Sequence, residues 1–108
     1  MSNEIAVIQA AREVCNTVDS MLIAYRSRRM ITRQQKITLE EKIRAYRVIA
    51  RNQAIGQVFN STINELAKAQ QLMDSMQFSE VGYEMAQQQY RILGEQLRRN
   101  LEEFSNGL

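Results

Sequence analysis

Apolar residues recur along the chain at alternating spacings of three and four, which is the period of one face of an α-helix. Three stretches carry this pattern, approximately residues 3–28, 38–76 and 79–105. Proline is absent and only 4 glycines are present, so few residues oppose a helix. The pattern therefore predicts an all-α protein in which residues 1–108 form a single helical domain. We expect an elongated antiparallel three-helix bundle, or helical hairpin, with a long central helix.

The central stretch, residues 38–76, begins with a capping box formed by Thr38 and Glu41. Its apolar face changes direction near the middle, by roughly 150° on the helical wheel. Gly56 lies at this change, and a glycine costs about 1 kcal/mol in a helix interior. A continuous helix that contacts other helices on two sides would explain the rotation, and so would a break between Asn52 and Gly56. We expect the continuous helix.

The third stretch has two apolar faces of unequal width. The wider face is a regular seam: Tyr83, Ala86, Tyr90, Leu93, Leu97, Leu101 and Phe104. The narrower strip lies on the opposite side and consists of Val81, Met85 and Ile92. Three helices leave this strip and the helix ends without an evident cover. We therefore expect an oligomer, such as a homodimer, or an obligate partner.

The formal net charge is only +2, but basic residues are concentrated between positions 26 and 51. This segment holds nine basic and two acidic residues, and most of the basic ones are arginine. The guanidinium group suits bidentate contact with phosphate or carboxylate. A solvated helix face, a site for an acidic protein and a site for nucleic acid are all compatible with such a block. Its candidate partner-binding residues are Arg26, Arg28, Arg29, Arg33, Arg44, Arg47 and Arg51.

Three methionines gather near the second predicted connection: Met73, Met76 and Met85. Methionine is flexible and polarizable, so it fills irregular gaps in a core and also forms adaptable binding surfaces. The three residues would therefore either fill the core at the tip of a hairpin or offer an apolar surface to a partner helix. We include them among the candidate partner-binding residues.

The composition argues against catalysis. The chain has no histidine, so it lacks an imidazole base and any zinc site of the mixed Cys/His type. Cys15 is the only cysteine and lies on the apolar face of the first stretch, where we expect it to be buried. Paired glutamates such as Glu40 and Glu41 are neighbours in a helix and point about 100° apart, so they do not converge. We expect no enzyme activity, cofactor, metal or small-molecule substrate.

No segment approaches the run of about 18 apolar residues that would span a membrane. The first residues also lack a basic region followed by an apolar one, the mark of a secretory signal. A single cysteine fits a reducing compartment. By elimination we expect a cytoplasmic protein.

These observations favour a non-enzymatic helical protein–protein interaction module, such as a small adaptor, a chaperone-like protein or an assembly accessory protein. The expected partner is another protein, including a second copy of this chain. The alternative is a nucleic-acid-binding accessory or regulatory protein that uses the arginine-rich segment 26–51.

Overall fold

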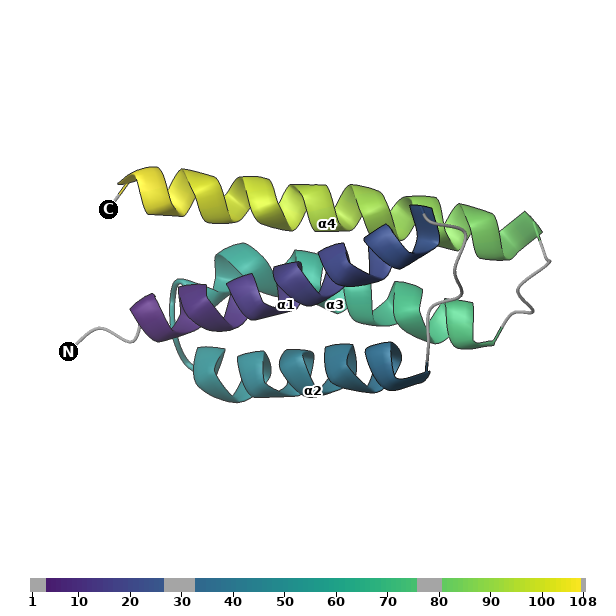
Figure 1. The fold of residues 1–108 in the computed structure, drawn as a ribbon. Coiled ribbons are helices and arrows are strands. Elements are labelled where there is room, and N and C mark those ends of the chain that lie inside the picture. Colours follow the sequence, from purple (N-terminus) through teal and green to yellow (C-terminus); the bar gives the residue numbers. More distant parts are fainter. Residues whose placement is uncertain (1–3, 27–32, 76–80, 108) are drawn as a thin grey trace.

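The structure, a computed structural model, describes residues 4–26, 33–75 and 81–107 (Figure 1). The described residues form four helices and no strand: α1 (Glu4–Arg26), α2 (Arg33–Ala50), α3 (Gly56–Asp74) and α4 (Val81–Gly107). Successive helices run in opposite directions, and α1 packs along both α2 and α4, while α3 packs along α4 (Figure 1). The molecule measures 48 × 24 × 19 Å. The prediction of an elongated, antiparallel, all-α fold is therefore confirmed, but the described residues form four helices rather than the expected three.

The predicted continuous helix over residues 38–76 is wrong. The chain leaves helical geometry after Ala50 and resumes it at Gly56, so α2 and α3 form an antiparallel hairpin. Asn52 has a φ angle of 61°, a left-handed conformation that asparagine tolerates better than most residues. The turn is closed by hydrogen bonds from Gln53 N to Ala50 O and from Gly56 N to Gln53 O, both 3.0 Å long. The change of apolar face therefore marks a reversal of the chain.

Close packing at the start of α3 explains the glycine at position 56. A Cβ atom there would lie 3.1 Å from both the Cβ and the carbonyl oxygen of Ala50. The Tyr46 hydroxyl donates to the Gly56 carbonyl oxygen over 3.0 Å and also lies 2.7 Å from Asn60 Oδ1. The last turn of α2 and the first turn of α3 are thus held together at the corner. Because of this corner, both apolar faces of the central stretch meet the same core.

All four helices contribute to one continuous core. In α4 the predicted seam is buried from Tyr83 to Leu101, and its last member, Phe104, is partly buried. The Phe104 ring lies 5.6 Å from that of Phe59 in α3, measured between centroids. Cys15 is buried in α1, as expected. Periodicity therefore identified the core positions of α4 correctly.

Candidate interaction surface

The structure spreads the arginine block over both ends of the bundle. Helix α2 begins at Arg33, and Arg51 follows its last residue. Since α2 has 18 residues, these two arginines are separated by about 27 Å along its axis. Arg44, Arg47 and Arg51 are exposed at helical spacings on one face, as the sequence predicted. The described arginines of the block, Arg33 to Arg51, therefore do not form a single patch.

Four of the sequence-predicted residues are not placed in this surface. Arg28, Arg29 and Met76 lie outside the described residues. Arg26 is the last residue of α1, and its side chain is likewise outside the description. The described part of the basic block consequently begins at Arg33.

Two lysines of the block bind acidic residues of neighbouring helices. Lys36 Nζ lies 2.7 Å from Asp74 Oδ1 and joins α2 to α3. Lys42 Nζ lies 3.0 Å from Glu13 Oε2 and joins α2 to α1. These ion pairs neutralise part of the basic excess and position α2 against its neighbours. Among the described residues of the block, the positive charges left for an external partner are those of Arg33, Arg44, Arg47 and Arg51.

Met73 and Met85, the two methionines of this group that the structure describes, do not form a common surface. Met73 is 1% exposed and packs in the core, which for this residue is the first of the two alternatives, a core position at the end of a hairpin. The stripe through Leu66, Ala69 and Met73 faces inward because the hairpin directs that face of α3 toward the other helices. Met85 is 67% exposed on α4, and Ile92 on the same helix is also exposed. The predicted uncovered strip thus exists for these two residues, while the side chain of Val81 is not described.

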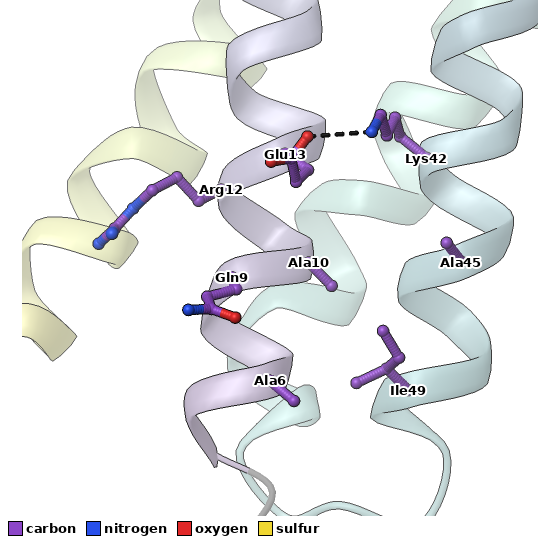
Figure 2. Close-up of a pocket in the computed structure, with 8 residues that line it drawn as sticks. All are labelled: Ala6, Gln9, Ala10, Arg12, Glu13, Lys42, Ala45 and Ile49. Carbon is purple, nitrogen blue, oxygen red and sulfur yellow. Dashed lines mark ion pairs between the residues drawn. The ribbon is translucent and has the colours of Figure 1, made fainter.

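A groove between α1 and α2 was not anticipated from the sequence (Figure 2). It has a volume of about 620 Å³ and is lined by Ala6, Gln9, Ala10, Arg12, Glu13, Lys42, Ala45 and Ile49. Figure 2 shows three alanines and Ile49 along the facing sides of the two helices, with the Glu13–Lys42 ion pair across one end. Arg12 extends away from the groove toward α4. The groove is therefore apolar along its centre and polar at its margin.

Further apolar side chains are exposed on the same two helices. Ile5 of α1 and Val48 of α2 are each about two-thirds exposed. The sequence feature that relates to the groove is a pair of small residues one helical turn apart, Ala6 and Ala10. Small side chains let another helix approach closely. The local sequence of α1, however, does not indicate that α2 forms the opposite wall of the groove.

Among the described residues, the groups with displaced pKa values are buried. Burial raises the pKa of the Cys15 thiol, and the Arg98 guanidinium offsets this effect in part. Burial raises the pKa of Tyr46 to about 12. Burial, with a smaller contribution from the charge of Asp74, also raises the pKa of Tyr90. At neutral pH these three groups are protonated and removed from solvent, which is the opposite of an activated nucleophile.

The described residues contain neither a cluster of metal ligands nor a membrane-spanning helix. No three His, Cys, Asp or Glu side chains among them are placed so that they could hold a metal ion. Of the four described helices, none is both long enough and apolar enough to cross a bilayer. Comparison with protein families, curated proteins and solved structures found no match to this chain.

Proposed function

We propose that this chain is a non-enzymatic, helical protein-binding module that accepts a helix of its partner in the groove between α1 and α2. The observation that carries the proposal is the groove itself, with its alanine-lined centre and the Glu13–Lys42 ion pair at one end (Figure 2). An amphipathic helix that places its apolar face into a hydrophobic groove is a common mode of protein recognition.

The side chains of the groove suit such a partner. Packed helices lie about 8–10 Å apart, and the smaller distances require small residues at the contact. Ala10 and Ala45 provide such residues on opposite walls. Ile49, which is 39% exposed, gives the partner an apolar side chain to cover.

An experiment on Ala45 tests the proposal. Ala45 is exposed and lines the groove, so Ala45→Arg would obstruct it without entering the core. The matched control is Ser61→Arg, which adds the same charge at an exposed position of α3. Proteins retained from the native host by the wild-type chain and by Ser61→Arg should be lost, or reduced by about tenfold, with Ala45→Arg in quantitative mass spectrometry. Equal retention by all three proteins would contradict the proposal.

Nucleic-acid binding is the second candidate function. The exposed arginines at 44, 47 and 51 favour it, because their common face could follow a phosphate backbone. Glu40, one turn before Arg44, and the two paired lysines weigh against it. A labelled DNA duplex tests this alternative: log K should fall with log salt by about 0.9 per phosphate neutralised. Replacing the three arginines by glutamate should reduce that slope, and an unchanged slope would exclude this face as the DNA site.

A further inference from the structure

A second hollow lies on the other side of α2, at its turn into α3. It has a volume of about 580 Å³ and is lined by Arg47, Ala50, Arg51, Asn52, Gln53, Ala54, Gln57, Asn60 and Asn64. None of these residues lines the α1–α2 groove, so the protein-binding proposal leaves this hollow unused.

The lining of this hollow is polar and carries charge of one sign only. Arg47 and Arg51 lie four residues apart, one turn of the chain from each other. The other polar lining side chains are all amides, and no aspartate or glutamate is among the lining residues. Amides and guanidinium groups together offer many N–H donors. A concave surface with two positive charges and no negative one favours an anion.

Internal hydrogen bonds position one side of the hollow. Arg47 Nη2 donates to Asn64 Oδ1 over 3.1 Å, which holds the guanidinium group against α3. Since arginine can only donate, the Asn64 oxygen is the atom used in this contact, and its amide N–H groups stay available to a ligand. The Tyr46 hydroxyl, bonded to the Gly56 carbonyl oxygen, secures the corner beneath. The donors on this side are therefore held in place before any ligand binds.

Arg51 supplies the second charge. It is exposed, lies immediately before Asn52 with its left-handed backbone, and forms no ion pair with any described residue. The backbone N–H groups at the start of α3 are already used, because Gly56, Gln57 and Val58 donate to the carbonyl oxygens of the three residues at 53–55. Recognition in this hollow must therefore come from its side chains.

We propose that this hollow binds the phosphate monoester group of a small phosphorylated molecule. A phosphate monoester carries a charge of about −1.5 to −2 and three acceptor oxygens at neutral pH. This charge matches the two arginines, and the three oxygens can accept from both guanidinium groups and from the amides of the wall. One arginine alone can satisfy both oxygens of a carboxylate, so a carboxylate would leave the second arginine without a partner. The volume of the hollow exceeds that of a phosphate group and leaves room for the molecule that carries it.

The test is a titration of the full chain with anions in a phosphate-free buffer at pH 7.5. Chemical shifts of the backbone amides and the arginine side chains are monitored by nuclear magnetic resonance at each step. The probes are inorganic phosphate and glycerol 3-phosphate, with dimethyl phosphate and acetate as singly charged comparisons. Both dianions should produce saturable shifts centred on Arg47, Arg51 and Asn64. Dimethyl phosphate and acetate should bind at least severalfold more weakly, since each has one negative charge to place between two arginines.

Three variants make the titration specific. Arg51→Gln should weaken phosphate binding by about tenfold. Arg51→Lys should weaken it by a smaller factor, because lysine keeps the positive charge but lacks the paired N–H donors of the guanidinium group. Arg44→Gln is the matched control: it removes the same charge from an exposed arginine of α2 that does not line the hollow, and affinity should change less than twofold. Absence of saturable shifts, equal binding of dimethyl phosphate, or equal losses in Arg44→Gln and Arg51→Gln would each overturn the proposal.

Discussion

Gly94 of α4 packs directly against Val18 of α1. A Cβ atom at position 94 would lie only 2.9 Å from Val18 Cγ1, and Val18 is fully buried. The Cys15 thiol lies one turn away from Val18, with its Sγ 4.0 Å from the Gly94 carbonyl oxygen. The backbone of α4 thus approaches α1 at this point more closely than any residue with a side chain would allow.

Replacing Gly94 by alanine should therefore destabilise the protein. Alanine is favoured over glycine in a helix by about 1 kcal/mol, but a β-branched valine cannot move aside easily, and overpacking a core costs about 1–3 kcal/mol. We expect a net loss of about 1 kcal/mol in the free energy of unfolding, measured by urea denaturation. Gly82→Ala, at a partly exposed site in the first turn of α4, should be neutral or slightly stabilising.

A double-mutant cycle separates steric conflict from other causes. Val18→Ala removes the atom that the new Cβ would meet, so Gly94→Ala should cost less in that background than in the wild type. Additive effects of the two changes would show that contact with Val18 is not the reason for the loss.

Gln87 of α4 should lower the stability of the bundle. It is 2% exposed, and neither its Nε2 nor its Oε1 atom has a hydrogen-bond partner in the structure. A buried polar group without a partner costs about 1–3 kcal/mol, so Gln87→Leu should raise the free energy of unfolding by about 1–2 kcal/mol. Gln88→Leu, at the next and exposed position, should change it by less than about 0.5 kcal/mol. A loss of stability in Gln87→Leu would show that the amide contributes more than the structure indicates.

The left-handed backbone at Asn52 predicts opposite effects for two substitutions. Asn52→Gly should maintain or slightly increase stability, because glycine adopts a positive φ angle without steric cost. Asn52→Val should lower the free energy of unfolding by about 1–2 kcal/mol, because a β-branched residue is strained there. Thermal and urea denaturation would check both values. If valine were tolerated as well as glycine, the turn between α2 and α3 would not have the observed geometry.

Stability should decrease in alkaline solution, in part because of Tyr46. Burial raises the pKa of Tyr46 from 10.0 to about 12, so the folded state binds the phenolic proton more tightly than the unfolded state does. The resulting stabilisation is fully present below pH 10 and is lost as the pH rises from about 10 to 12. Tyr46→Phe should lower stability at pH 8 through loss of the hydrogen bond to Gly56, but its stability should fall less steeply between pH 10 and 12. Parallel pH dependences of the two proteins would contradict this assignment.

The sequence determined the helical class and much of the core. The absence of proline and the spacings of three and four predicted helices throughout, and the seam of α4 was buried as predicted from Tyr83 to Leu101. These features follow from local properties, because helix period and propensity depend on residues within a few positions of each other. The exposed face of Arg44, Arg47 and Arg51 was predictable for the same reason.

The position at which the chain reverses depends on tertiary packing. Residues 50–56 contain one signal for a continuous helix and one for a break. The apolar pattern that continues on a new face favours the continuous helix, and the glycine, which weakens a helix, favours the break. A straight helix would have turned Leu39 and Phe59 toward different sides, whereas the hairpin buries both in one core. The gain in buried apolar area from this reversal depends on α1 and α4, which a local pattern does not contain.

Both candidate sites were likewise decided by tertiary packing. The groove requires Ala10 of α1 to face Ala45 of α2, and the hollow requires Arg47 to reach Asn64 across the turn. Alanine, asparagine and glutamine carry no distinctive signal at these positions in the sequence. Their chemistry becomes specific only when the packing of α2 against α1 on one side and α3 on the other sets which side chains share a surface, because a site is defined by distances between residues far apart in the chain.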